Sequence, residues 1–238
     1  MKYAFGLLLS VLLLAACTPL KNLQTVATRI PCIGSVGAIK NGVFSKEFQK
    51  VGEPQISESI AVALQSHAFT NVTYRAYQKY RENLGKPPSV AYHDSLEVAP
   101  RFFQLEVADR VRLKSLLNAK SNTSLLHYLE EDSNIQMLTG ISFVTMGPQH
   151  QSLEEAQHIS LTQKEGHLIL QVENSIGNLE IDMKSLEVFD FETSGFCWQT
   201  NQRNQPAIAV LIGTGESCPR GTEKSANKLD ETRQYLKL

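Results

Sequence analysis

The stretch HISLTQKEGHLILQV, residues 158–172, decides the fold class of this 238-residue chain. Apolar Ile159 and Leu161 alternate with polar neighbours, a turn at Glu165-Gly166 follows, and a second alternating run leads the chain back. Alternation with a period of two is typical of a strand with one buried face, and a turn between two such runs indicates a hairpin. The stretch therefore predicts two antiparallel strands.

Further strands are expected beyond this hairpin. A turn at 175–178 leads into a third alternating segment, and more candidates follow at intervals of ~8 to 12 residues, the spacing of antiparallel sheets. The expected segments are 179–183, 186–192, 196–200 and 207–212. We therefore expect an antiparallel β-meander in the C-terminal half of the chain.

Helical patterns are found in the N-terminal half. In residues 55–65, after Pro54, Ile56, Ile60 and Leu64 recur at helical spacing, which predicts a short helix. Residues 73–84 predict a second helix, because tyrosines recur there every third residue before a stop at Gly85.

The middle of the chain combines both patterns. Alternating residues at 103–107 predict a strand, and Asp109 stands where a helix that ends near Asn118 would need its N-cap. Ser121 or Asn122 begins another short helix, and a strand at 135–146 follows. Together with the meander, these segments predict an α+β fold in which short helices from the N-terminal half pack on a C-terminal sheet.

Length and charge limit the domain organisation and the partners. Residues 31–238 have the size of a single domain, with a polar tail at the C-terminus. The formal net charge is -1, so the chain has no long-range field to gather nucleic acid. We therefore expect no nucleic-acid partner.

The N-terminal segment has the pattern of a signal peptide. Met1 and Lys2 precede an apolar run, residues 3–14, which is shorter than the ~20 residues of a spanning helix. The next residues, Leu14-Ala15-Ala16-Cys17, resemble the lipobox of bacterial lipoproteins. The resemblance implies that residues 1–16 are removed, and that Cys17 carries a diacylglyceryl group and, usually, an acyl chain such as palmitate on its amine.

The same resemblance predicts where the mature protein is held. Thr18 follows the cysteine in place of aspartate, which in envelopes with two membranes resembles lipoproteins sent to the outer membrane. Residues 17–30 show no clear periodicity and contain Pro19, so we interpret them as a lipidated tether. The expected location is the cell envelope, where the N-terminal lipid anchors the protein to a membrane and the outer membrane is favoured over the inner membrane.

The other three cysteines would lie in an oxidising compartment. One bridge among Cys32, Cys197 and Cys218 can form in three ways. The pair Cys197 and Cys218 is favoured, because these residues flank the hairpin of the last two predicted strands. Cys32 would then be free and buried; an exposed, redox-active Cys32 is the alternative.

Motifs of established chemistry are missing from the sequence. The six histidines form no HExxH pattern, and neither a G-x-S-x-G nor a complete phosphate-binding loop is present. We therefore predict no catalytic residue, no metal site and no cofactor. Whether the chain is an enzyme stays open, with a non-enzymatic role favoured.

One segment suggests a ligand surface. Three tyrosines alternate with cations in residues 73–86, and such groups can hold glycans or lipid headgroups by stacking and hydrogen bonding. The candidate residues are Tyr74, Tyr77, Tyr80, Arg75 and Lys79. The alternative, which is favoured, is a helix whose tyrosines form a buried stripe.

The sequence thus predicts a lipid-anchored envelope protein that binds or assists an envelope protein or glycan. An envelope hydrolase whose catalytic residues are dispersed along the chain is the alternative.

Overall fold

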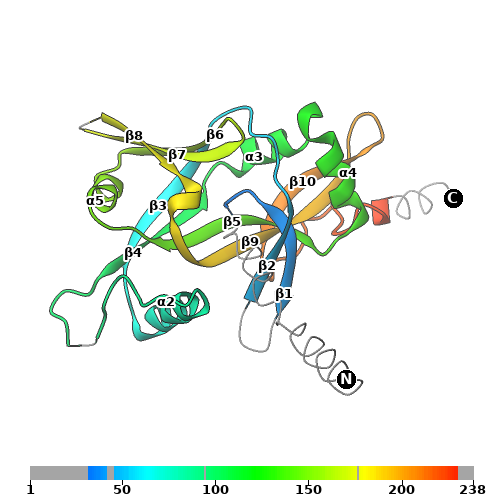
Figure 1. The fold of residues 1–238 in the computed structure, drawn as a ribbon. Coiled ribbons are helices and arrows are strands. Elements are labelled where there is room, and N and C mark those ends of the chain that lie inside the picture. Colours follow the sequence, from blue (N-terminus) through cyan, green and yellow to red (C-terminus); the bar gives the residue numbers. More distant parts are fainter. Residues whose placement is uncertain (1–31, 42–45, 94, 176, 230–238) are drawn as a thin grey trace, which may run out of the picture. The chain divides into compact units, whose positions relative to one another are not determined.

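The computed structural model describes residues 32–41, 46–93, 95–175 and 177–229 (Figure 1). All of them belong to one compact unit of the chain. The expected signal peptide, Cys17 and the tether lie outside the described residues, as does the tail beyond residue 229. No helix within the described residues has the length and apolarity to cross a membrane.

Ten strands of the described chain form one sheet, in which every paired neighbour is antiparallel. The order is β10-β9-β5-β4-β3-β6-β7-β8, while β1 pairs with β5 and β2 pairs with β1. The strands are β1 Val36–Asn41, β2 Lys46–Gly52, β3 Ile60–Ala68, β4 Arg101–Val107, β5 Ile135–Val144, β6 His158–Lys164, β7 His167–Asn174, β8 Gly177–Asp182, β9 Glu187–Thr200 and β10 Pro206–Gly213.

Short helices accompany the sheet (Figure 1). They are α2 Asn71–Asn83, α3 Arg110–Leu117, α4 Thr123–Glu131 and α5 Pro148–Glu154. Helix α3 packs against β10, and α2 packs against β9. The architecture is therefore α+β, as the sequence predicts, with an antiparallel sheet.

Strand β5 is the centre of the sheet. Met137 pairs with Val36 of β1 on one side and with Ser194 of β9 on the other. Gly140, three residues later, pairs with Glu106 of β4 and Glu192 of β9. Strand β5 thus pairs with three strands, and nearly all of its residues are buried.

The middle of the chain follows the sequence pattern closely. Strand β4, helices α3 and α4 and strand β5 succeed one another as predicted. Asp109 is the N-cap of α3, where its carboxylate accepts the N–H of Arg112 at 2.8 Å. Helix α2 and the turn at Glu165-Gly166 also match their predictions.

The prediction of a helix at residues 55–65 is wrong. Strand β3 begins at Ile60 and pairs with β4 over seven positions. Ile60 and Leu64 fit a period of two as well as a helical spacing, and pairing within the sheet decides between them. The N-terminal half therefore contributes strands as well as helices.

The prediction of a continuous C-terminal meander is also wrong in part. Strands β6, β7 and β8 follow one another as predicted, but the chain then leaves them. The segments 186–192 and 196–200 form one long strand, β9, which pairs with β5 and β10. Ser194 and Thr193 are buried within it, so polar residues in the middle of β9 do not mark a turn.

Candidate functional site

One face of the central sheet is polar and open to solvent. We call it the polar sheet face and define it by two rows of side chains across β3, β4, β5 and β9. The strand register aligns Ala63, Glu106, Gly140 and Glu192 in the first row, and Gln65, Gln104, Ser142 and Asp190 in the second. Apart from Gly140, all are exposed or half-buried, whereas Leu105 and Ile141 of the opposite face are buried.

Two carboxylates converge above Gly140. The glycine lies between Glu106 and Glu192, and a Cβ at this position would be 3.2 Å from Glu192 Cβ and 3.4 Å from Glu106 Cγ. Because Gly140 has no side chain, the aliphatic parts of both glutamate side chains can approach each other above it. A larger residue at 140 would push them apart.

The side chain of Gln104 bridges this pair. Its Nε2 donates to Glu106 Oε1 at 2.7 Å and lies 3.2 Å from Glu192 Oε1. The two bonded oxygens therefore lie at most about 6 Å apart, a limit that includes the ~5 to 5.5 Å between the paired carboxyl groups of retaining glycosidases. The face thus presents acceptors, amide donors and a hydroxyl on rigid strands.

Helix α2 covers one end of this face. Tyr74 and Tyr77 are buried and pack with Phe69, Phe102 and Val144. Tyr74 donates its hydroxyl to Val90 O at 2.9 Å. The tyrosine stripe is therefore a core element, which matches the favoured interpretation of the sequence.

Hydrogen bonds and an ion pair connect α2 to β9. Tyr77 donates to Glu187 Oε1 at 2.7 Å and also contacts the Ser89 hydroxyl at 2.5 Å. Arg81 pairs with the same Glu187 oxygen at 2.9 Å. Burial, reinforced by the charge of Glu187, raises the pKa of the nearby Tyr80 to about 12.

The predicted ligand surface on α2 is not assembled as one patch. Arg75 and Lys79 are exposed, whereas Tyr74 and Tyr77 point into the core and Tyr80 is half-buried. The rings and the cations therefore lie on different sides of the helix.

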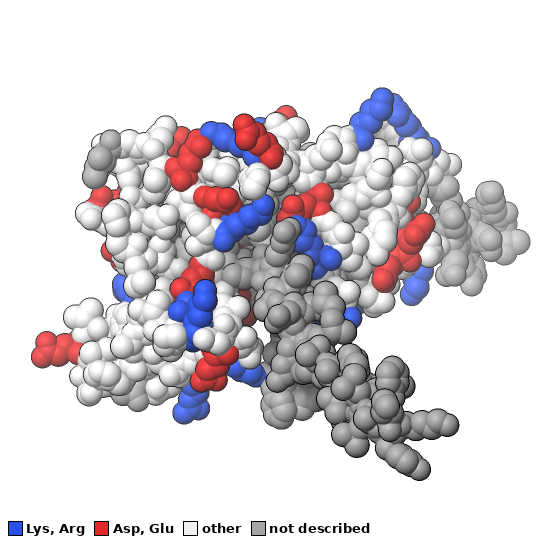
Figure 2. Space-filling view, viewed as in Figure 1, with Lys and Arg blue, Asp and Glu red and all other residues white. Residues whose placement is uncertain are grey.

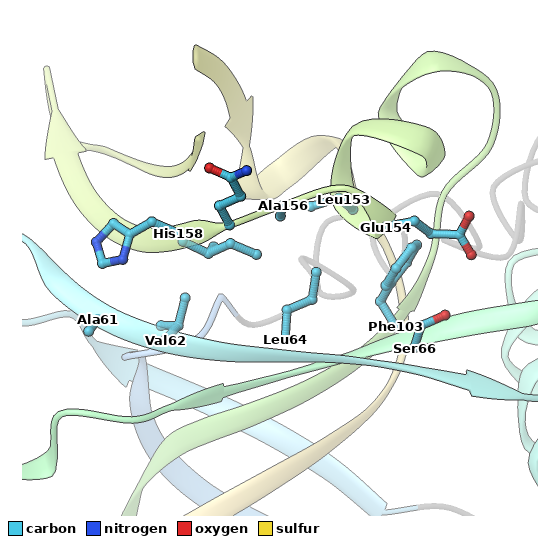
Figure 3. Close-up of a pocket in the computed structure, with 11 residues that line it drawn as sticks. Ala61, Val62, Leu64, Ser66, Phe103, Leu153, Glu154, Ala156 and His158 are labelled. Atoms are coloured by element: carbon cyan, nitrogen blue, oxygen red, sulfur yellow. The ribbon is translucent and has the colours of Figure 1, made fainter. Parts of the chain in front are cut away.

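A cavity of about 300 Å³ lies beside β3, where α5 and the start of β6 form its other wall. Figure 3 shows Val62 and Leu64 pointing from β3 toward Leu153, Ala156 and His158. Its size is at the lower end of ligand pockets, which span about 300 to 1,000 Å³. Apolar side chains share the lining with the polar residues Ser66, Glu154, Gln157 and His158.

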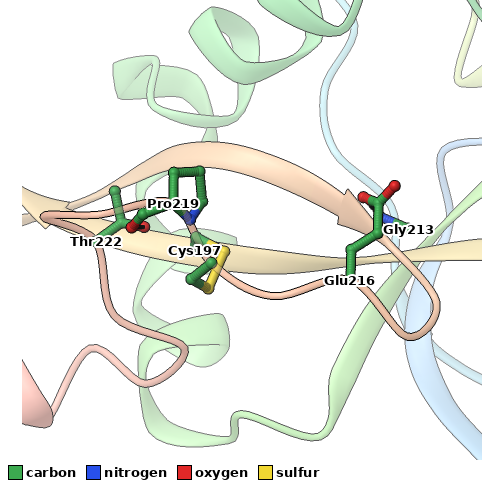
Figure 4. Close-up of a disulfide and its surroundings, with 6 residues drawn as sticks. Cys197, Gly213, Glu216, Pro219 and Thr222 are labelled. Carbon is green, nitrogen blue, oxygen red and sulfur yellow. Dashed lines mark hydrogen bonds between the residues drawn. A yellow bond between two sulfur atoms is a disulfide. The ribbon is translucent and has the colours of Figure 1, made fainter.

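A disulfide lies near the edge of the sheet that β10 forms. Cys197 of β9 is bonded to Cys218, the pair that the sequence favours (Figure 4). Next to it, Trp198 and Glu223 exchange backbone hydrogen bonds of 2.7 and 2.9 Å. The segment after β10 is thus fastened to β9 by a covalent bond and a β-bridge.

The remaining described cysteine lies in the protein interior. Cys32 is free and buried. Burial raises the pKa of its thiol, with a further contribution from Glu53. Because the thiolate is the reactive form, the buried role that the sequence favours fits this residue better than the redox role.

Charges elsewhere are mixed. Figure 2 shows acidic and basic side chains interspersed over the face in view. Within the described ranges, no group of three or more His, Cys, Asp or Glu is arranged to hold a metal ion.

Comparison with protein-family models, curated proteins and solved structures finds no match for this chain.

Proposed function

We propose that this chain is a lipid-anchored cell-envelope protein whose α+β domain binds an envelope glycan, without catalysis, through the polar sheet face. The observation that supports it is the pair of polar rows on four adjacent strands. Sugar hydroxyls both donate and accept hydrogen bonds, and the face offers carboxylate acceptors at Glu106 and Glu192 beside amides at Gln65 and Gln104. Side chains on strands are held more rigidly than side chains on loops.

The anchor in this proposal is lipidated Cys17, with an outer-membrane location favoured. Two or three acyl chains, at about 0.8 kcal/mol per buried methylene, would keep the domain on the bilayer. The tether, residues 17–30, would set its distance from the membrane.

Replacing the anchor residue tests this part directly. We expect Cys17→Ala to move the full-length protein from the membrane fraction to the soluble periplasmic fraction, because no thioether to lipid can form. Cys32→Ala is the matched control and should stay with the membranes. The measurement is fractionation of cells with mass spectrometry of the N-terminal peptide. A membrane-bound Cys17→Ala protein, or wild type with an unlipidated Cys17, would contradict the anchor.

Removing the two central charges tests the ligand surface. We expect the double variant Glu106→Gln with Glu192→Gln to bind isolated peptidoglycan at least about tenfold more weakly, since hydrogen bonds to charged groups contribute about 1.5 to 3 kcal/mol. Glu58→Gln, an exposed carboxylate paired with Arg112 outside the polar sheet face, is the control. Co-sedimentation of the detergent-solubilised protein measures the binding. Equal binding by all three proteins would reject the surface.

An envelope hydrolase is the second candidate, and the convergence of Glu106 with Glu192 favours it. The same variants separate the two functions. A hydrolase would release soluble fragments from peptidoglycan, and the double variant would lose this release while it still sedimented with the polymer. Binding without release by the wild type supports the non-enzymatic role.

A further inference from the structure

The polar sheet face is closed at one end along its strands. Beyond the row that contains Gln104, the next aligned side chains are His67 of β3 and Phe102 of β4. Their rings pack together with centroids 5.6 Å apart, and Phe102 belongs to the buried cluster that includes Tyr77 of helix α2. A ligand that ran along the strands would therefore meet α2 directly after the second row.

Across the strands, the face is open at both ends. Strands β3, β4, β5 and β9 are adjacent in the sheet. No described strand pairs with the outer edge of β3 at Gln65 or with the outer edge of β9 at Asp190, and both side chains are exposed. A chain-like ligand can therefore enter over β3 and leave over β9.

Strand geometry gives the dimensions of this face. Neighbouring strands are about 4.8 Å apart, so a row that crosses four strands is about 14 Å long. The two rows are separated by two residues along each strand, which is about 7 Å. The polar sheet face is thus a strip about twice as long across the strands as along them.

Both long sides of the strip carry hydrogen-bonding groups. The first row includes carboxylates at Glu106 and Glu192, and the second includes amides and a hydroxyl at Gln65, Gln104 and Ser142. A chain of linked pyranoses carries hydroxyl groups along both of its edges. In a β-(1→4)-linked chain, each pyranose advances the chain by nearly one strand spacing, so each strand can contact one sugar.

Charge restricts which part of a glycan fits the strip. The eight aligned positions contain the carboxylates of Glu106, Glu192 and Asp190 and no lysine or arginine. Placing acidic groups of a ligand against these carboxylates is unfavourable, because like charges across an interface repel each other. Uncharged sugars avoid this cost, and their hydroxyl groups can donate to the carboxylates. The strip therefore suits the sugar backbone of a glycan better than its acidic substituents.

We propose that the polar sheet face binds an uncharged, β-(1→4)-linked stretch of glycan that crosses β3, β4, β5 and β9, with one sugar on each strand. This inference rests on the proposed function and specifies its ligand. The sugar backbone lies on the strip, and acidic substituents of the polymer point away from it. Affinity therefore rises with chain length until all four strands are covered, and it rises little beyond that length.

Oligosaccharides of defined length test this on the full-length protein in detergent, by isothermal titration calorimetry. We expect the β-(1→4)-linked tetrasaccharide of N-acetylglucosamine to bind at least about tenfold more tightly than the disaccharide, because it reaches two more strands. The hexasaccharide should gain no more than about twofold over the tetrasaccharide. A tetrasaccharide of β-(1→4)-linked glucuronic acid, an anionic chain with the same linkage, should bind at least about tenfold more weakly than the uncharged tetrasaccharide.

Protein variants test the direction of the chain. Gln65→Ala and Asp190→Asn change opposite ends of the strip, and each should weaken binding of the tetrasaccharide at least about fivefold. The effect on the disaccharide should be smaller, because it can occupy the strands that remain. Glu58→Gln, outside the polar sheet face, is the control and should bind like wild type. Thermal unfolding shows whether all variants fold.

The probes separate a failure of this inference from a failure of the proposed function. If the protein sediments with peptidoglycan but the tetrasaccharide neither binds nor competes at about 1 mM, the inference is wrong and glycan binding stands. Equal affinities for the disaccharide and the tetrasaccharide, or for the uncharged and the anionic chain, would also overturn it. If wild type binds neither peptidoglycan nor the oligosaccharides, the proposed function is rejected together with this inference.

Discussion

Replacing both residues of the disulfide, Cys197→Ala with Cys218→Ala, is expected to lower the free energy of unfolding by about 3 kcal/mol. The bridge spans a sequence separation of 21 residues, and its loss returns loop entropy to the unfolded chain. It also leaves the bridge between Trp198 and Glu223 as the main fastening of the segment after β10. Urea unfolding followed by tryptophan fluorescence measures the change, because Trp198 is buried.

Chemical reduction supplies the control for this experiment. Wild type in excess reductant should unfold at the same urea concentration as the double variant, and reductant should not affect the variant. If reduction left the wild-type midpoint unchanged, the bridge would contribute nothing to stability and the prediction would be wrong.

Asn122→Ala is expected to cost about 3 kcal/mol, the second large effect. The Asn122 side chain is buried; it accepts the N–H of Gln55 at 2.7 Å and donates to the carbonyls of Gln55 and Leu116 at 3.1 and 3.0 Å. Truncation leaves these backbone groups without their partner, and each buried unsatisfied group costs about 1 to 3 kcal/mol. The free energy of unfolding in urea measures the loss.

Asn118→Ala is the matched comparison for Asn122→Ala. Asn118 pairs in the same way with the N–H and the C=O of Ile208, at 2.9 Å each, but it is half-buried. Water can replace part of its function, so we expect a smaller loss of about 1 kcal/mol. Equal losses for the two variants would contradict the explanation by burial.

The parts of the fold that are predictable from the sequence rest on local signals. Asp109 marks the start of α3, the tyrosine spacing marks α2, and alternation marks β6 and β7. Asn122 shows the limit of such signals. The sequence suggests a helix cap, and the residue is indeed the N-cap of α4, but its side chain makes no cap hydrogen bond and binds Gln55 instead.

The candidate site could be predicted only in small part. Alternation places Gln104 and Glu106 on the solvent side of β4, because Phe103 and Leu105 are apolar. Glu192 joins them through the register of β5 with β9, which contains two irregularities. A register that shifts within a strand pair cannot be derived from periodicity. Strand β3 escaped prediction for another reason, since its segment fits a helix as well as a strand.

The central position of β5 has a consequence for the folding pathway. Its neighbours come from residues 36–38, 103–106 and 187–194, so the sheet cannot close before β9 has been synthesised. Contacts between residues so distant in sequence slow folding, because the entropy of loop closure is lost before the contacts form. A nascent chain will thus expose the apolar side of β5 until its last third emerges, and this interval is when it most needs a chaperone.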